Sequence, residues 1–280
     1  MSWSLLDFGD GRRLDRFGDI TLDRPAPAVA DLAPASPRAW AAADARFDKT
    51  TGWQPAGGVP AAWNVEIAGV RLELRPTPAG QVGLFPEHVA PAAAAAREVE
   101  TLARDLGRPV EALNLFAYTG LASLLLARAG ARVAHVDASK PAVAWARRNA
   151  AVAGLDAAPV RWLVEDALAF TAREARRGRH YDVVILDPPT YGHAPRGGGP
   201  WHLDAGLAAL LEACAAVTGP RPRYVLLTAH ATGLRPGDLR AAVGAAWGPA
   251  LAAEAAIEPL GPARPDGAVL PAGVSVIVRA

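Results

Sequence analysis

The segment Tyr181–Leu186 reads Tyr-Asp-Val-Val-Ile-Leu, and the turn Asp187–His193 directly after it reads Asp-Pro-Pro-Thr-Tyr-Gly-His. The apolar run predicts a buried strand, which places the turn at the carboxyl end of that strand. In open α/β sheets, ligands bind at this end. Proline fixes φ and removes a backbone donor, so the two prolines leave rigid carbonyls beside the Asp187 carboxylate. Such a turn is suited to holding a planar, nitrogen-bearing group.

Around this turn, strands and helices alternate from Pro91 to the end of the chain. Repeated β-α units of this length predict an α/β fold with a Rossmann-like, doubly wound and mainly parallel sheet. We predict strands at Glu111–Phe116, Arg132–Asp137, Val160–Glu165, Tyr181–Asp187, Arg223–Thr228 and Val274–Arg279. We predict helices at Pro91–Leu106, Leu121–Ala129, Lys140–Ala153, Ala167–Arg176, Leu203–Val217 and Pro236–Trp247.

The amino-terminal part of the chain is rich in turns and lacks long helical periodicity. The glycine-containing turn Gly9–Gly11 separates two short apolar-bearing runs, as in a hairpin, and Gly69 separates Trp63–Ile67 from Val70–Leu74 in the same way. We predict a further strand at Gln81–Phe85. The sequence therefore predicts a small β-rich module at residues 1–86 and a large α/β domain at residues 87–280.

Composition limits the classes of partner and compartment. With 29 basic and 28 acidic residues, the chain is not a polycation, so a nucleic-acid partner needs a local basic patch. The single cysteine, Cys214, lies in an apolar helical pattern and excludes an intrachain disulfide or a multi-cysteine zinc site. No membrane span or signal peptide is evident, and no metal-ligand spacing links the histidines, so we expect a cytoplasmic protein without a metal.

A second turn follows the first predicted strand of the large domain. The segment Asn114–Gly120 reads Asn-Leu-Phe-Ala-Tyr-Thr-Gly and contains one glycine. Dinucleotide-binding turns carry three, because their backbone must approach a pyrophosphate. One glycine favours a cofactor without phosphates, bound through an amino-acid moiety or a nucleoside.

Acidic residues end the next two predicted strands. Asp137 is placed to accept hydrogen bonds from both hydroxyls of a ribose, and Asp166 from an adenine amino group. An acidic residue after a strand is also a common helix N-cap. For Asp166 the cap and the ligand role are equally open, whereas for Asp137 we favour the ligand role. The order of glycine turn, two acids and Asp-Pro-Pro along successive strand ends is much more specific than any one of them.

This order resembles class I S-adenosylmethionine-dependent methyltransferases, above all the large-subunit (23S) ribosomal RNA methyltransferases and their uncharacterised relatives. The resemblance covers roughly residues 81–280 and implies a seven-stranded sheet whose final strand is antiparallel and inserted beside the fifth. It implies S-adenosyl-L-methionine as cofactor. Phe85, in the stretch before the first helix, is expected either to flank the cofactor or to be an ordinary strand aromatic. The other cofactor residues implied are Asn114, Phe116, Ala117, Tyr118, Thr119, Gly120, Asp137, Ala138, Ser139, Asp166 and Asp187.

The resemblance also implies the catalytic residues Asp187, Pro188 and Tyr191. A base nitrogen must reach the Asp187 carboxylate and the Pro188 carbonyl, while the Tyr191 ring stacks on the base or, alternatively, packs on the sheet edge. Cytosine-C5 methylation needs a thiolate. In relatives of that kind the thiol lies just after the fifth strand, where this chain has His230 instead. Nitrogen methylation is therefore favoured over thiol-dependent C5 chemistry.

The predicted function is methylation of a nucleobase nitrogen in ribosomal RNA. Alternatives that stay open are a protein or small-molecule acceptor and a noncatalytic cofactor-binding relative; an NAD-dependent oxidoreductase is less favoured. Participation of His230 and of the Gly-rich loop Arg196–Trp201 also stays open, as does the oligomeric state.

Overall fold

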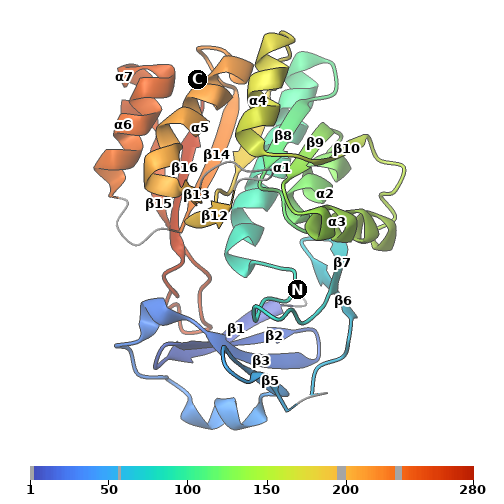
Figure 1. The fold of residues 1–280 in the computed structure, drawn as a ribbon, viewed down its shortest axis with the longest axis vertical. Coiled ribbons are helices and arrows are strands. Elements are labelled where there is room, and N and C mark those ends of the chain that lie inside the picture. The colour runs from blue at the N-terminus through green and yellow to red at the C-terminus, as the bar shows by residue number, and fades with distance from the viewer. Residues whose placement is uncertain (1–2, 56–57, 194–199, 231–234) are drawn as a thin grey trace. The chain divides into compact units, whose positions relative to one another are not determined.

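The computed structural model describes residues 3–55, 58–193, 200–230 and 235–280 (Figure 1). The chain forms two compact units. One comprises Met1–Val89 together with Leu260–Ala272, and the other comprises Ala90–Pro259 together with Gly273–Ala280. The predicted large domain ran without a break from residue 87 to 280, so the assignment of Leu260–Ala272 to the first unit was not anticipated.

The second unit contains a seven-stranded sheet in the order β10-β9-β8-β11-β14-β16-β15. The first five of these strands are parallel, and β16 runs antiparallel to β14. The predicted Rossmann-like fold is therefore confirmed, including the antiparallel last strand beside the fifth. The strands are β8 (Glu111–Leu115), β9 (Arg132–Asp137), β10 (Val160–Val164), β11 (Val183–Leu186), β14 (Tyr224–Ala229), β15 (Ala256–Leu260) and β16 (Gly273–Val278).

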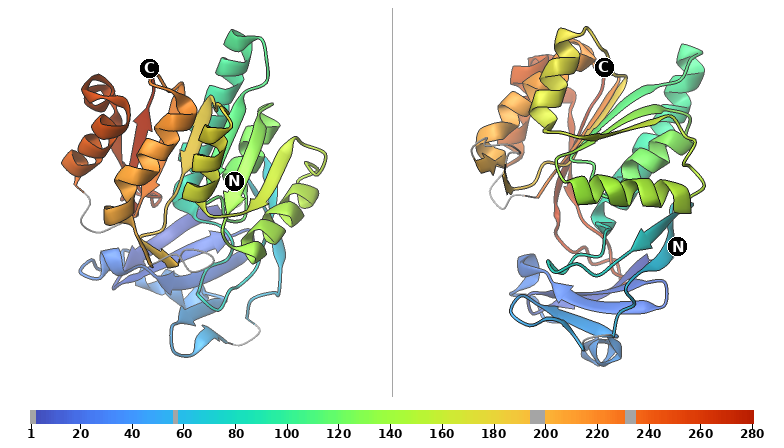
Figure 2. Two further views of the ribbon diagram at one scale, coloured as in Figure 1. Left: turned by 45° about the horizontal axis from the view of Figure 1, so that its top comes forward. Right: turned by 45° about the vertical axis from the view of Figure 1, so that its right-hand side comes forward.

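Helices cover both faces of this sheet (Figure 2). Strand β8 shows why, since Ala112 belongs to one hydrophobic core while Leu113 and Leu115 belong to the other. The core containing Ala112 packs on α1 and α2, and the core containing Leu113 packs on α4, α5, α6 and α7. The helices are α1 (Val89–Leu106), α2 (Leu121–Arg128), α3 (Lys140–Val152), α4 (Ala167–Arg176), α5 (Leu203–Thr218), α6 (Pro236–Trp247) and α7 (Pro249–Glu254).

Four short elements of this unit were not predicted individually. Helix α7 and strand β15 follow the predicted helix at Pro236–Trp247, and the strands β12 (Tyr191–His193) and β13 (Pro200–His202) form an antiparallel pair. Strand β15 lies at the edge of the sheet, is mostly exposed and contains Pro259. Edge strands tolerate proline and polar side chains, so they lack the apolar pattern by which the buried strands were found. Among the described residues, no helix combines the length and the hydropathy that a membrane span needs.

The first unit contains a five-stranded sheet in the order β1-β2-β3-β4-β5 and a separate two-stranded pair, β6-β7. Both predicted hairpins are present, and positive φ angles at Asp10, Gly11, Ala68 and Gly69 shape their two-residue turns. The strands are β1 (Trp3–Gly9), β2 (Arg12–Phe17), β3 (Ile20–Pro25), β4 (Ala45–Asp48), β5 (Gly52–Gln54), β6 (Trp63–Ile67) and β7 (Val70–Leu74). Short 3-10 helices occur at η1 (Pro27–Val29), η2 (Pro37–Ala42) and η3 (Pro86–His88).

A buried carboxylate ties the returning segment Leu260–Ala272 into the first unit. Asp7 is fully buried, and its Oδ1 accepts a hydrogen bond from Nη1 of Arg264 at 2.7 Å. The same carboxylate accepts bonds from Nε1 of Trp40 and from the backbone amides of Ala35 and Ser36. Leu270 packs in the apolar cluster of this unit. A buried charge with this many donors is strongly held, because its desolvation is compensated.

The strand predicted at Gln81–Phe85 is wrong. The Gln81 amide donates to Oγ1 of Thr77, and the Gln81 carbonyl accepts from the Thr77 amide at 2.8 Å. The Val82 carbonyl accepts from the Arg75 amide, and Gly83 has a φ of 90°. These local bonds make the stretch an irregular turn, so the apolar alternation of the sequence does not lead to sheet pairing.

Candidate functional site

The carboxyl ends of the parallel strands bring the predicted site residues of the second unit to one edge of the sheet. The turn 116–120 follows β8, Asp137 ends β9, and Asp166 follows β10 by two residues. Asp187 follows β11, and His230 follows β14. Ligands bind at such an edge in open α/β sheets. The alternation pattern of the sequence therefore placed these residues together correctly.

The turn after β8 has an unusual backbone. Phe116 and Tyr118 have φ angles of 56° and 48°, which large side chains seldom adopt, and Gly120 has a φ of 96°. A Cβ at Gly120 would lie 3.0 Å from Cβ of Ala146 on α3, so a glycine is also required by the close approach of that helix. Backbone strain of this kind is retained where the surrounding structure imposes it, often at ligand sites.

Three amides of this turn are bonded within the protein. The Ala117 amide donates to the Val136 carbonyl at 3.1 Å, and the Gly120 amide donates to the Ala117 carbonyl at 3.1 Å. The Tyr118 amide donates to Oδ2 of Asp137 at 2.8 Å. A phosphate cradle needs backbone amides that point at the ligand. The turn is therefore suited to a group other than a phosphate.

Asp137 is held by backbone donors from both sides of its strand end. Its Oδ2 accepts from the Tyr118 amide, and its Oδ1 accepts from the Ser139 amide at 2.8 Å. A carboxylate has about four acceptor positions, so each oxygen can accept a further bond from a ligand hydroxyl. Partial burial raises the pKa of Asp137 above its usual value, and the two backbone hydrogen bonds oppose this rise.

Ser139 and Asp166 both cap helices. Oγ of Ser139 accepts from the Ala142 amide at the start of α3, and Oδ1 of Asp166 accepts from the Ala169 amide at 2.9 Å at the start of α4. The sequence had left open whether Asp166 caps a helix or binds a ligand, and the structure shows that it caps α4. Its role toward an adenine stays a prediction, as does that of the exposed Ala138.

A buried polar network lies beneath the turn, and the sequence pattern did not identify it. Nδ2 of Asn114 donates to Oγ of Ser123 at 2.9 Å, and the same hydroxyl lies 2.9 Å from Nδ1 of His135. Burial, with the charge of Arg147 acting in the same direction, lowers the pKa of His135 to about 3. Nδ2 of Asn149 donates to the Thr119 carbonyl at 2.9 Å. The side chain of Asn114 therefore supports the turn from inside, and its predicted contact with a cofactor stays a prediction.

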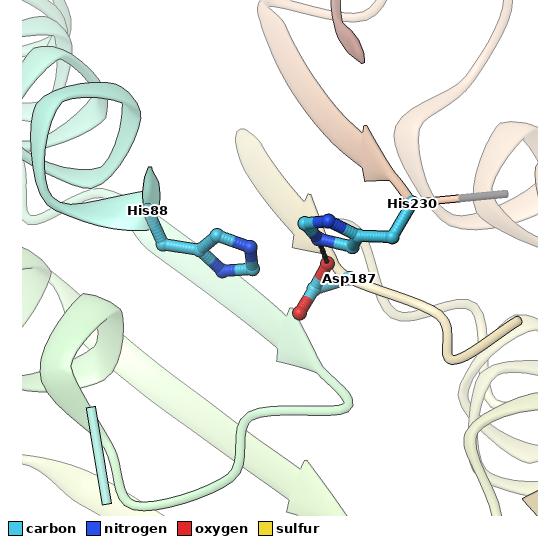
Figure 3. Close-up of side chains that lie close together, drawn as sticks. All are labelled: His88, Asp187 and His230. Carbon is cyan, nitrogen blue, oxygen red and sulfur yellow. Dashed lines mark hydrogen bonds and ion pairs between the residues drawn. The ribbon is translucent and has the colours of Figure 1, made fainter. Parts of the chain in front are cut away.

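Asp187 is bonded to Thr228 of the neighbouring strand β14 and to His230 directly after that strand, and Figure 3 shows the contact with His230. Its Oδ1 accepts from the Thr228 hydroxyl at 2.6 Å and lies 3.0 Å from Nε2 of His230. Thr228 is 3% exposed, whereas Asp187 and His230 are partly exposed. His88, the third residue labelled in Figure 3, belongs to the first unit. From the sequence, participation of His230 was an open question and Thr228 was not identified as a site residue. Thr228 could have been found, because it lies near the carboxyl end of β14, the strand that neighbours β11.

The remaining residues of the Asp-Pro-Pro turn differ in their surroundings: some are buried or bonded within the protein, and one is largely exposed. The Pro189 carbonyl accepts a hydrogen bond from Nε1 of Trp201 at 2.8 Å, so this carbonyl is used within the protein. Pro188 is buried. Tyr191 is 72% exposed, and its ring lies edge-on to His202 with centroids 5.2 Å apart. The predicted roles of Pro188 and Tyr191 in catalysis stay predictions.

Three further features of the sequence concern Phe85, the Gly-rich loop Arg196–Trp201 and Cys214. Phe85 belongs to the first unit, where its ring centroid lies 5.9 Å from that of His88, and its place beside a cofactor stays a prediction. Residues 196–199 of the Gly-rich loop lie outside the described residues. Cys214 is buried in α5, and burial raises the pKa of its thiol to about 12. A thiol in that state is not a nucleophile near neutral pH.

A family described as conserved hypothetical protein 95 matches residues 88–194. The crystal structure of the SAM-dependent methyltransferase from Agrobacterium tumefaciens is similar over 100% of this chain and 90% of that chain, with 34% identity and a TM-score of 0.89. The structure of SMU.776 complexed with SAH has a TM-score of 0.76 over 99% of this chain and 75% of that chain, and at 15% identity it bears on the fold alone.

Curated relatives carry the name ribosomal RNA large subunit methyltransferase K/L. The protein from Shewanella frigidimarina is 29% identical over 57% of this chain and 21% of its own length. The protein from Marinobacter nauticus is 32% identical over 55% of this chain and 20% of its own length. The aligned part is thus about a fifth of the length of these relatives.

Proposed function

The chain belongs to the S-adenosylmethionine-dependent methyltransferase family, and we propose that it methylates a nucleobase nitrogen in ribosomal RNA. The observation that carries the proposal is the Asp187 carboxylate, held at the carboxyl end of β11 and followed by two prolines. That arrangement provides rigid acceptors for a planar base at the sheet edge where this fold binds ligands.

The residues at this edge fit S-adenosyl-L-methionine. The amides of Ala117, Tyr118 and Gly120 are used within the protein, which suits a cofactor without phosphates. Asp137 retains acceptor positions for the two ribose hydroxyls. The residues of this edge that would hold the cofactor are Asn114, Phe116, Ala117, Tyr118, Thr119, Gly120, Asp137, Ala138, Ser139, Asp166 and Asp187.

In the proposed reaction, the bound cofactor supplies a methyl group that its sulfonium already activates. The protein therefore contributes orientation and exclusion of water. The Asp187 carboxylate and the Pro188 carbonyl accept hydrogen bonds that align the base nitrogen. The Pro189 carbonyl is bonded to Trp201, which leaves the Pro188 carbonyl as the proline acceptor in this role. Tyr191, being largely exposed, offers an aromatic face on which the base stacks.

Ribosomal RNA is proposed as substrate because curated relatives that align with about half of this chain are named for it. The reaction would then take place in the cytoplasm. A protein or small-molecule acceptor is the alternative, since the aligned part covers only about a fifth of those relatives.

Two measurements test the proposal in sequence. Calorimetric titration should give tight binding of S-adenosylhomocysteine and negligible binding of NAD; tight binding of NAD alone would reject the cofactor. Transfer of a labelled methyl group should then occur to ribosomal RNA from a strain that lacks the gene, with less transfer to RNA from the parent strain. Equal labelling of the two RNAs, or labelling of protein alone, would reject the substrate.

A further inference from the structure

The side chains that hold Asp187 come from the end of β14 and from the residue directly after that strand. Parallel pairing places Leu186 of β11 beside Leu227 of β14, so Asp187 and Thr228 follow as neighbours at the strand ends. His230 lies two residues beyond Thr228. The register of the sheet therefore places Thr228 beside Asp187, and His230 reaches the same carboxylate from just beyond the end of β14.

Both side chains act as donors to the same oxygen. An ionised carboxylate only accepts hydrogen bonds, so the Thr228 hydroxyl donates to Oδ1 of Asp187 over 2.6 Å. Nε2 of His230, 3.0 Å from the same oxygen, must carry a hydrogen to form its bond. The contact thus selects the ring forms of His230 that are protonated at Nε2. Bonds between neutral donors and a carboxylate are short and strong.

We propose that Thr228 and His230 are positioning residues that fix the Asp187 carboxylate for methyl transfer. This inference rests on the function proposed above. Two donors that approach one oxygen from different residues restrict rotation about the Cβ–Cγ bond as well as the choice of rotamer. The carboxylate therefore keeps one orientation when the acceptor base arrives.

The expected kinetic effect follows from the sensitivity of transfer to geometry. A misplacement of about 1 Å in a reacting group costs on the order of 100-fold in rate. Loss of either donor should therefore lower kcat by about 10- to 100-fold without weakening cofactor binding. Because both donors act through Asp187, the loss in the double variant should be smaller than the product of the two single losses.

Substitutions at Thr228 separate the hydroxyl from the space it fills. Thr228→Val keeps the shape of the side chain and removes the donor, whereas Thr228→Ser keeps the donor. We expect Thr228→Val to lower kcat and Thr228→Ser to retain most of it. The matched control is Thr171→Val, which removes another fully buried hydroxyl that is bonded to the Ala167 carbonyl at 2.7 Å on α4. Equal rates for Thr228→Val and the control would overturn the assignment of Thr228.

Substitutions at His230 test whether its N–H donor is what matters. Gln offers an amide N–H at nearly the reach of Nε2, and Ala offers none. We expect His230→Ala to lose about 10- to 100-fold in kcat, and His230→Gln to recover most of that loss. Unchanged binding of S-adenosylhomocysteine would show that both variants are folded. A folded His230→Gln enzyme as slow as His230→Ala would overturn the positioning role of His230.

A spectroscopic measurement tests the geometry even if ribosomal RNA is not the substrate. In nitrogen-15 NMR, Nε2 of His230 should give the signal of a protonated nitrogen, and this signal should shift in Asp187→Asn. His180→Gln, which removes an exposed histidine before β11, serves as the control for assignment. A His230 signal that is unaffected by Asp187→Asn would overturn the inference. Absence of methyl transfer by the wild-type enzyme would instead reject the proposed function alone.

Discussion

Carboxylates at the two edges of the same sheet have different hydrogen-bond partners. At the amino edge, Asp182 forms a two-bond ion pair with Arg108, both bonds at 2.8 Å, and lies 3.3 Å from Nε of Arg223. At the carboxyl edge, Asp137 accepts bonds from two backbone amides, and Asp187 accepts from a threonine hydroxyl and a histidine ring. Charges are paired with arginines at one edge and are held by largely neutral donors at the other.

This difference separates a stabilising edge from a binding edge. An arginine that occupies both oxygens of a carboxylate contributes to stability and leaves little acceptor capacity for a ligand. Neutral donors orient a carboxylate while its charge stays available to hydroxyls or to a base. Glu165 is an exception at the carboxyl edge, because Arg173 of α4 pairs with it. The contrast therefore marks Asp137 and Asp187, rather than every acid at that edge, as the residues that meet ligands.

The largest effect is expected from Asp187→Ala. Loss of the carboxylate should reduce methyl transfer by about 100- to 1000-fold, the scale seen when a main stabilising group is removed. Binding of S-adenosylhomocysteine, measured by calorimetry, should change little, because Asp187 is only one of several residues proposed to hold the cofactor and its carboxylate mainly serves the acceptor. Retained activity would refute the catalytic role of Asp187.

Asp182→Asn should affect stability without affecting the site. Removing the charge leaves Arg108 and Arg223 without their partner, and we expect the free energy of unfolding to fall by about 1–2 kcal/mol, less than for a fully buried pair because both arginines are half exposed. Urea unfolding measures this loss. The control is cofactor affinity, which should equal that of the wild type; a weakened affinity would contradict the separation of the two edges.

Asp137→Ala should produce the converse result. We expect cofactor affinity to fall by about 1–3 kcal/mol, the cost of losing charge-assisted hydrogen bonds. The readout is the dissociation constant of S-adenosylhomocysteine. Unchanged affinity would show that Asp137 serves only as the acceptor for the Tyr118 and Ser139 amides.

Acidification should produce a smaller and graded effect that again distinguishes the edges. Burial raises the pKa of Asp137, so its charge is lost as the pH falls through a value above the usual range, and cofactor affinity should decrease there. For Asp182, burial acts to raise the pKa, but the hydrogen bonds from Arg108 and from the Glu111 amide outweigh it and lower the pKa. The stability that Asp182 contributes is present above its unfolded pKa and is lost only as the pH falls through the lower folded value. As the pH falls, cofactor affinity should therefore be lost at a higher pH than the stability contributed by Asp182. Loss of both at the same pH would contradict the distinction between the two edges.

The sequence predicted the layered sheet because its central strands are buried on both faces. Val183–Leu186 and Tyr224–Ala229 are buried at every position and are apolar except at Thr228, and such runs are characteristic of parallel strands. Strand β15 escaped prediction because an exposed edge strand has no such run. Gln81–Phe85 has the alternation of a strand, but local bonds to Arg75 and Thr77 determine its conformation.

The candidate site was predictable in part for a similar reason. Asp137 and Asp187 could be located because each ends a strand that the sequence reveals. Contacts between residues far apart in the chain could not be read in the same way, as the pairing of Thr228 with Asp187 and of Arg264 with Asp7 shows. Those contacts depend on which strands become neighbours and in what register.

We propose that the carboxyl edge of this sheet directs methyl transfer to a nucleobase nitrogen of ribosomal RNA. The most direct test is mass spectrometry of the nucleosides of ribosomal RNA from a strain that lacks the gene, complemented with the wild-type chain or with Asp187→Ala. We predict that one nitrogen-methylated nucleoside is lost on deletion of the gene, is restored by the wild-type chain and is not restored by Asp187→Ala. An unchanged set of nucleosides after deletion, or restoration by Asp187→Ala, would contradict it.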